Sequence, residues 1–235
     1  MKEYTVFIFF FAITMFQSQI NIDYSVVSHK EDYQLKINII NTSDDHYLLP
    51  FDVTGFKAYY ESEYCGDFAD QDYPYKFFAP TVMLKEENTT DYLLPGSSRG
   101  HMPEGEGAEQ YIKDLQATAS KQLKEIDNWK EKYHFRSYKD ALKNYYITKN
   151  LLFLKPREKY SYEIPLDLGT ITRTNTSTLY DYYFLKFARY DLSLHICVTP
   201  DAYSWLTKQQ KRELRKYKPF KGVMKSNSYK FKAYE

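Results

Sequence analysis

The chain has 235 residues, and its charges almost cancel, with 32 Lys and Arg against 31 Asp and Glu. This length suits one elaborated domain or two small ones, and it is ample for a hydrophobic core. Beyond the first 16 residues no apolar stretch approaches the roughly 20 residues of a membrane-spanning helix, so no further part of the chain is expected to cross a membrane.

Residues 1–19 have the pattern of a signal peptide. Lys2 precedes an apolar run, Val6–Phe16, which is too short to span a membrane and is followed by the polar residues Gln17–Gln19. The pattern predicts cleavage near Gln19 and an exported protein, periplasmic, on the cell surface or secreted. The alternative is an uncleaved N-terminal anchor. Removal of the signal peptide leaves residues 20–235, and no transmembrane span is expected in them.

The two cysteines, Cys65 and Cys197, predict a disulfide. In an exported chain an even number of cysteines indicates pairing. The alternative is two buried free thiols.

Alternation of apolar and polar residues predicts strands in the first part of the chain. These strands are Ile20–Ser28, Tyr33–Ile40, Phe56–Ser62, Tyr75–Leu84 and Asp91–Pro95. Asn41–Asp45 is rich in turn-forming residues and predicts a hairpin-like corner between the second strand and the apolar residues after it. Pro80 indicates an edge strand or a bulge, because proline cannot donate a ladder hydrogen bond.

The period then changes to steps of three and four, which predicts a long amphipathic helix over Gly107–Tyr133. Ser137 is placed to cap a second, short helix whose inward residues are expected to be Ala141, Leu142, Tyr145 and Tyr146. The two helices form a predicted insertion at about residues 105–148.

Strand patterns return after the insertion. They cover Leu151–Lys155, Tyr160–Leu166, Leu179–Tyr190, Asp191–Val198 and Gly222–Ala233. For the third of these a helix is the alternative. A helix is predicted from Thr199 and Pro200 to about Tyr217, since proline is favoured at the first helical position.

Together these elements predict a mainly β fold. The strand number and turn spacing favour an antiparallel immunoglobulin-like β-sandwich with an inserted αα pair and a C-terminal helix before the last strand. We expect a single domain over residues 20–235.

Two segments resemble exported accessory β-sandwich proteins of Gram-negative bacteria. They are INIINTSDDHYLLP, a strand followed by a polar corner, and the block LSLHICVTP…WLTKQQKREL…FKGVMKSNSYKF. The resemblance implies an immunoglobulin-like fold and assigns no functional residue.

No catalytic or metal-binding motif is evident, and no cofactor is expected. The sequence has no G-x-S-x-G elbow and no C-x-x-C. His195 and Cys197 share one face of a predicted strand and would allow a thiolate–imidazole pair, but a structural strand explains them better. Acidic residues between Glu61 and Asp72 lack the pattern of a calcium loop and indicate a hydrated surface.

Tyrosine is unusually frequent, with 25 in 235 residues. Clusters occur at Tyr59–Tyr60, Tyr73–Phe78, Tyr145–Tyr146 and Tyr180–Phe184. Exposed tyrosines are typical of protein interfaces, and their rings can also stack on sugars. The alternative is that they fill half-buried strand positions.

The sequence therefore predicts a non-catalytic exported interaction module that binds a protein or another envelope component through an aromatic-rich surface. One alternative is a carbohydrate-binding module, which a coplanar row of exposed Tyr or Trp in a groove would favour. Another is a hydrolase, which a deep pocket holding His195 beside a carboxylate would favour. Nucleic acid is not an expected partner, although residues 201–235 carry ten Lys and Arg against three Asp and Glu.

Overall fold

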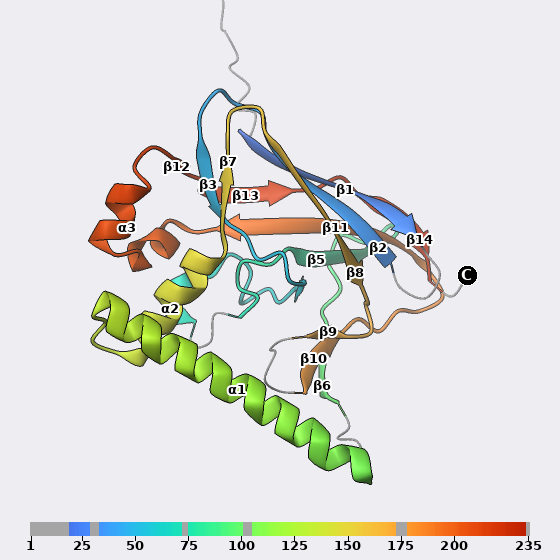
Figure 1. Ribbon diagram of the computed structural model, residues 1–235. Coiled ribbons are helices and arrows are strands. Elements are labelled where there is room, and N and C mark those ends of the chain that lie inside the picture. The colour runs from blue at the N-terminus through green and yellow to red at the C-terminus, as the bar shows by residue number, and fades with distance from the viewer. Residues whose placement is uncertain (1–18, 29–32, 72–74, 101–104, 173–177, 234–235) are drawn as a thin grey trace, which may run out of the picture.

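The protein is mainly β, with several antiparallel sheets and a few helices (Figure 1). The computed structural model describes residues 19–28, 33–71, 75–100, 105–172 and 178–233. Apart from Gln19, the predicted signal peptide lies outside the described residues. None of the helices in the described ranges has both the length and the apolar composition needed to cross a membrane.

One three-stranded antiparallel sheet is built from the strands with the clearest alternation. It has the order β1 (Ile20–Ser28), β2 (Tyr33–Asn41) and β8 (Lys159–Leu166). Ile22 pairs with Ile39 and Tyr24 with Ile37, and all four side chains are buried. The alternation in the sequence therefore marks the face of this sheet that contributes to the core.

The strand β11 (Arg189–Val198) is the centre of the largest sheet. Its companions are β5 (Thr81–Glu86), β4 (Lys57–Ala58), β13 (Gly222–Lys225) and β14 (Tyr229–Lys232). The expected single closing strand is split because Asn227 turns toward β1. The Asn227 side-chain amide exchanges hydrogen bonds of 2.9 Å with the backbone N–H and C=O of Tyr24.

Two smaller three-stranded sheets complete the β structure. One contains β3 (Tyr47–Pro50), β7 (Leu151–Leu154) and β12 (Lys218–Pro219). The other contains β6 (Gly96–Arg99), β10 (Leu179–Tyr182) and β9 (Ile171–Thr172). Each of the four sheets contributes buried side chains to a single core cluster.

The prediction of a hairpin-like corner after β2 is wrong, because β2 and β3 belong to different sheets. Asn41 explains the change of direction. Its buried amide donates hydrogen bonds of 2.7 Å to the carbonyl oxygens of Asp45 and Lys155. The side chain thus joins the bend after β2 to the turn between β7 and β8.

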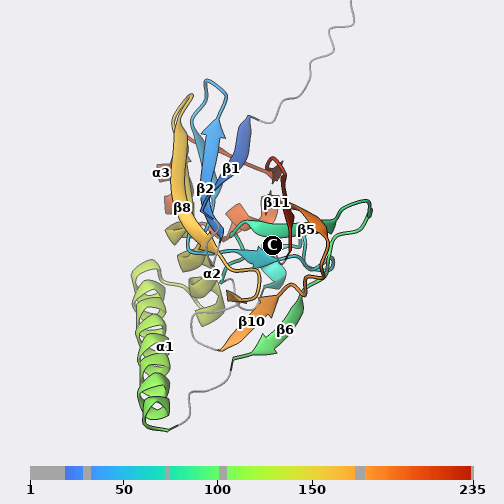
Figure 2. The same cartoon turned by 90° about the vertical axis from the view of Figure 1, so that its right-hand side faces the viewer.

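The helical pair lies where the sequence predicts it. The helix α1 spans Glu106–Tyr133, and α2 spans Tyr138–Lys149 with Ser137 as its cap, the Ser137 hydroxyl accepting a 3.0 Å hydrogen bond from the Asp140 N–H. Figure 2 shows α1 as a column beside the β-rich part of the molecule. The inward face of α2 differs from the prediction, since Lys143 and Asn144 are fully buried.

Three predicted elements are shorter than expected or displaced. In Phe56–Ser62 only Lys57–Ala58 is a strand, and a turn follows in which the Tyr64 N–H bonds the Tyr60 carbonyl. Pro80 directly precedes β5 instead of lying inside it. Asp91–Pro95 forms only an isolated bridge at Tyr92, and the strand is β6, which follows it.

The predicted tail helix is divided in two. A 3-10 helix, η2 (Pro200–Trp205), is followed by a short α3 (Lys208–Glu213). Thr207 and Gln210 form a capping box that starts α3, so the helical structure is interrupted just before α3. The segment Leu179–Tyr190 is likewise irregular between β10 and β11, and it is not a helix.

Candidate interaction surface

Of the four tyrosine-rich clusters, the segment around β10 has the most exposed ring. Phe78 is fully buried, and the Tyr146 hydroxyl donates a 2.8 Å hydrogen bond to the buried carboxylate of Asp52. Tyr73 lies outside the described residues. Phe184, in contrast, is 76% exposed.

We call the surface formed by Tyr180, Tyr182, Phe184 and Leu94 the aromatic platform. Tyr180 and Tyr182 lie two residues apart on β10 and so share a face of the strand. Phe184 follows two residues later, and the intervening Asp181 and Tyr183 are buried. The Tyr180 and Tyr182 ring centroids are 6.3 Å apart, and their planes are inclined by 51°. Leu94 is 64% exposed, and the nearby Phe187 is 70% exposed. Phe184, Phe187 and Leu94 are the three most exposed large apolar side chains among the described residues.

The pairing of β6 with β10 brings Leu94 to the same end of the ladder as Phe184. Gly96 pairs with Tyr182, Leu94 precedes Gly96 by two residues, and Phe184 follows Tyr182 by two. This end of the small sheet therefore presents the exposed side chains of Leu94 and Phe184 beside the tyrosines.

The opposite side of β10 anchors the platform to the rest of the protein. The buried Asp181 carboxylate accepts 2.8 Å hydrogen bonds from the hydroxyls of Tyr60 and Ser97. The Tyr183 hydroxyl donates to the carbonyl of Val82 at 2.7 Å and accepts from the Tyr59 N–H at 2.8 Å. Burial raises the pKa of Tyr183, so this hydroxyl keeps its proton. These contacts hold the outward rings at fixed positions.

Gly96 leaves room for the ring of Tyr182, which lies across it. A Cβ atom at position 96 would lie 2.6 Å from Cζ of Tyr182. We expect Gly96→Ala to displace the Tyr182 ring and to lower the free energy of unfolding by about 1 kcal/mol, measured by urea denaturation.

Gly107 provides the matched control. It is in α1, and a Cβ there would meet nothing within 4 Å. Gly107→Ala is expected to raise stability by about 0.5–1 kcal/mol, because alanine favours a helix over glycine. Equal effects of the two substitutions would contradict the close approach of Tyr182 to Gly96.

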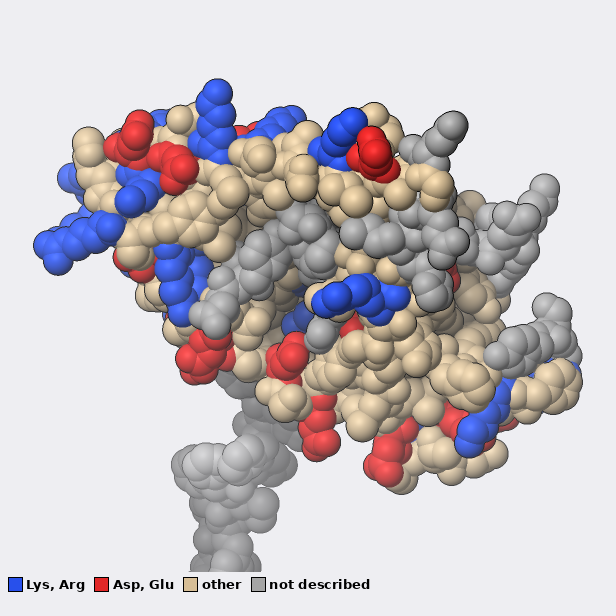
Figure 3. Space-filling model, turned by 90° about the horizontal axis from the view of Figure 1, so that it is seen from below, with Lys and Arg blue, Asp and Glu red and all other residues tan. Residues whose placement is uncertain are grey.

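Basic side chains border this region. The Lys232 ammonium lies 4.8 Å from the centroid of the Phe187 ring, and Lys186 and Arg189 are exposed. Arg189 is 3.9 Å from Glu87, a weak surface ion pair. Viewed from the side of α1 and β10, charges of both signs are scattered among uncharged side chains (Figure 3).

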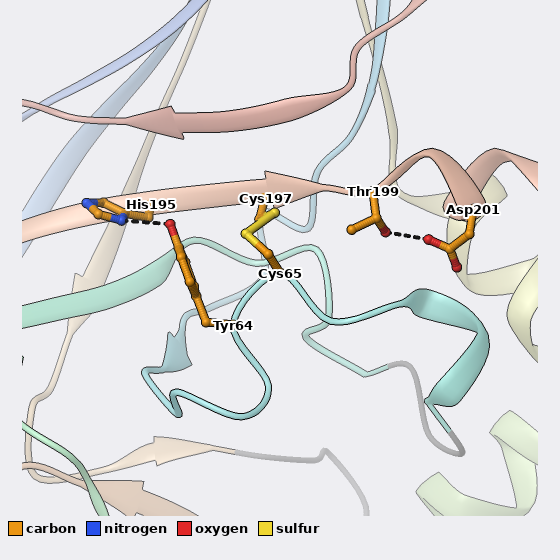
Figure 4. Close-up of a disulfide and its surroundings, with 6 residues drawn as sticks. All are labelled: Tyr64, Cys65, His195, Cys197, Thr199 and Asp201. Atoms are coloured by element: carbon orange, nitrogen blue, oxygen red, sulfur yellow. Dashed lines mark hydrogen bonds between the residues drawn. A yellow bond between two sulfur atoms is a disulfide. The ribbon is translucent and has the colours of Figure 1, made fainter.

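The predicted cysteine pair is joined in a disulfide (Figure 4). The Cα atoms of Cys65 and Cys197 are 5.3 Å apart, within the normal range for a bridge. The Tyr64 hydroxyl lies 3.0 Å from Nδ1 of His195, and the Ala69 N–H donates a 2.9 Å hydrogen bond to Asp201. The segment 64–69 is thus attached to β11 and η2 at three successive points.

His195 is a buried structural residue of β11. It is 3% exposed, and its Nε2 lies 3.4 Å from the Ser193 hydroxyl. The neighbouring rings are those of Tyr64 and Tyr92, and the positive charge of Lys225 acts on the imidazole. A deep pocket holding His195 beside a carboxylate would favour the hydrolase alternative, and these neighbours give it no support.

The buried imidazole should make the protein less stable in acid. Burial, and to a lesser extent Lys225, lowers the pKa of His195 to about 4. Between about pH 6.5 and pH 4 the unfolded chain binds a proton that the folded chain does not, so stability falls as the pH falls through this window. We expect His195→Gln to reduce this decrease, measured as the difference in unfolding free energy between pH 7 and pH 5 for both proteins. An identical decrease in unfolding free energy for the parent protein and His195→Gln would contradict the lowered pKa of His195.

The acidic residues of the 61–72 segment do not form a metal site among the residues that the structure describes. Glu61, Glu63, Asp67 and Asp70 are exposed, and Asp72 is outside the described ranges. No group of three or more His, Cys, Asp or Glu side chains in those ranges is arranged to hold a metal ion.

Sequence reasoning identified the cluster Tyr180–Phe184 but missed Leu94, Gly96 and Phe187. Gly96–Arg99 has no alternation of apolar and polar residues, so no sequence pattern predicts β6. Phe187 lies in a segment predicted to be a continuous strand, where alternation does not single it out.

Comparison with known proteins gave no match to any family model, curated protein or solved structure.

Proposed function

We propose that the protein is an exported, non-catalytic binding module that recognises a protein partner through the aromatic platform. The observation that carries the proposal is the high exposure of Phe184 and Leu94, which lie at one end of the anchored β6–β10 ladder, and of Phe187, which follows Phe184 by three residues. Large apolar side chains at the surface are typical of interaction sites, and aromatic residues supply much of the binding energy at protein interfaces.

The geometry favours a protein over a sugar at the platform. Tyr180 and Tyr182 are inclined by 51° to each other, so they do not form the coplanar row that would favour carbohydrate. Tilted rings fit instead between the side chains of a second protein surface. The exposed Lys186 and Arg189 at the border favour a partner with acidic residues around its contact site.

The proposed setting is outside the cytoplasm. The disulfide supports an oxidising compartment, and the N-terminal pattern of residues 1–19 supports export. We further propose an immunoglobulin-like β-sandwich, as in the exported accessory proteins that the chain resembles. The β1-β2-β8 sheet and the β11-centred sheet both contribute side chains to one core, which supports this fold.

Phe184 is the position at which to test the proposal. A photo-crosslinking phenylalanine analogue at position 184 should join the protein covalently to a partner in its native envelope, detected as a larger species by electrophoresis. Phe184→Ser should reduce capture of the same partner at least tenfold. Its unfolding free energy should stay within about 0.5 kcal/mol of that of the parent protein, since the ring is mostly exposed.

Phe153 is the matched control. It is 42% exposed on β7, away from β10 (Figure 1). The analogue at position 153 should give no such product, and Phe153→Ser should leave capture unchanged. Crosslinking that is equally strong at both positions, or absent from position 184, would contradict the proposed surface.

A further inference from the structure

A second site lies on the helical pair, at a distance from the aromatic platform in the sequence and in the fold. An open groove of about 260 Å³ is lined by residues of α1 and α2. Its lining residues are Glu125, Asn128, Trp129, Lys132, Tyr145 and Lys149. The volume is just below the range of about 300–1,000 Å³ that is usual for drug-sized ligands, so it suits a small ring.

The groove is built on fixed positions of two regular helices. Glu125, Trp129 and Lys132 recur on α1 at steps of four and three, which places them on one face. The indole N–H of Trp129 donates a 2.8 Å hydrogen bond to Oδ1 of Asn144, which is fully buried. Asn144 in turn donates to the Trp205 carbonyl and to Gln210 at 2.7 Å. The Trp129 ring is therefore oriented by a buried network.

Tyr145 forms the second wall of the groove. Its ring centroid is 5.3 Å from that of Trp129, with the planes nearly perpendicular. Its hydroxyl donates a 2.6 Å hydrogen bond to Oε2 of Glu125, and burial followed by this contact raises the pKa of Tyr145 to about 12. The hydroxyl stays protonated, and the carboxylate keeps acceptor sites for another donor.

The ammonium groups give the groove an excess of positive charge. Lys132 lies 5.5 Å from the Trp129 ring centroid, and Lys149 lies 5.5 Å from that of Tyr145. In the described part of the chain neither ammonium forms an ion pair with a carboxylate. With Glu125 as the single acid of the lining, the groove carries a net charge of +1.

We propose that this groove binds an acidic sugar, a pyranose ring that carries a carboxylate. The apolar face of the ring would stack on Trp129, its hydroxyls would bond Glu125 and Asn128, and its carboxylate would meet Lys132 or Lys149. A neutral sugar would form no ion pair with Lys132 or Lys149. A simple aromatic acid has no hydroxyls to bond Glu125 and Asn128.

The test is a titration of the folded protein with a trimer of α-1,4-linked galacturonate, followed by tryptophan fluorescence and calorimetry. For a ligand of this size we expect a dissociation constant on the order of 1 mM, with a change in Trp129 emission. Maltotriose, a neutral trimer, and benzoate, an aromatic acid, should each bind at least tenfold more weakly. Failure of the galacturonate trimer to bind, or equal binding of either comparison ligand, would overturn the proposal.

Charge variants locate the site without disturbing the core. Lys132→Gln and Lys149→Gln change exposed side chains, and together they should weaken galacturonate binding at least fivefold. Lys124→Gln makes the same charge change on an exposed part of α1 that does not line the groove, and it should change binding less than twofold. Equal weakening by Lys124→Gln would show non-specific electrostatic attraction and would contradict binding in the groove. Phe184→Ser should leave this binding intact, so the site is tested separately from the platform.

Discussion

Replacing both Cys65 and Cys197 with serine is expected to lower the free energy of unfolding by about 4 kcal/mol. The two residues are 132 positions apart, so the bond restricts a very large loop in the unfolded chain. In the folded protein it also holds the segment 64–69 against β11, where Tyr64 contacts His195. Guanidinium denaturation of the variant and of the oxidised parent measures the difference.

The single variants supply the control for this prediction. Cys65→Ser and Cys197→Ser each remove the same bond, so each should lose nearly as much stability as the double variant. Reduction of the parent protein should reproduce the loss. A decrease of less than about 1 kcal/mol in the double variant, both single variants and the reduced parent would contradict the prediction. It would mean that the other contacts of the segment 64–69 hold it without the disulfide.

Asn144→Ala is expected to lower stability by about 3 kcal/mol, because it leaves several buried polar groups without partners. The side chain is fully buried and bonds Trp129, Gln210 and the Trp205 carbonyl. These residues belong to α1, α3 and η2, so one amide connects three helical elements to α2. Urea denaturation gives the stability, and a change in tryptophan emission is expected because Asn144 bonds both Trp129 and the Trp205 carbonyl.

Asn128→Ala is the matched control for Asn144. Asn128 is an exposed residue of α1, and its removal should change stability by less than about 0.5 kcal/mol. A similarly small effect of Asn144→Ala would indicate that water replaces the lost contacts, and the proposed fixed orientation of Trp129 would then be wrong.

The sequence predicted those parts of the fold in which local pattern and burial agree. The strands β1, β2 and β8 have alternating sequences: Ile20, Ile22 and Tyr24 of β1 and Leu35, Ile37 and Ile39 of β2 are buried, and β8 alternates exposed with half-buried residues. The helix α1 follows its apolar period, and Ser137 caps α2 as expected. In β1 and β2 side-chain spacing alone distinguishes the face that is packed from the face that is solvated. On α1 the same reasoning locates the helix, but of its apolar positions Ile126 is buried whereas Ile112 and Leu123 are exposed.

Other parts depend on partners that are distant in the sequence. Lys143 is fully buried because its ammonium lies over the Trp205 ring, 4.4 Å from the centroid, and donates to the Ala69 carbonyl. No local pattern predicts a buried lysine. The strand β6 likewise forms because β10, some 80 residues later, pairs with it. Hence the sequence identified the Tyr180–Phe184 cluster but not the strand that supports it.

The disulfide also determines what a single proteolytic cut can do. Both inserted helices, and most of the folded chain, lie between Cys65 and Cys197. Cleavage of any one peptide bond in that interval gives two fragments that stay covalently joined until the bond is reduced. A nick in the protruding helix α1 would therefore leave a protein of unchanged mass on a non-reducing gel, with the platform of β10 still attached.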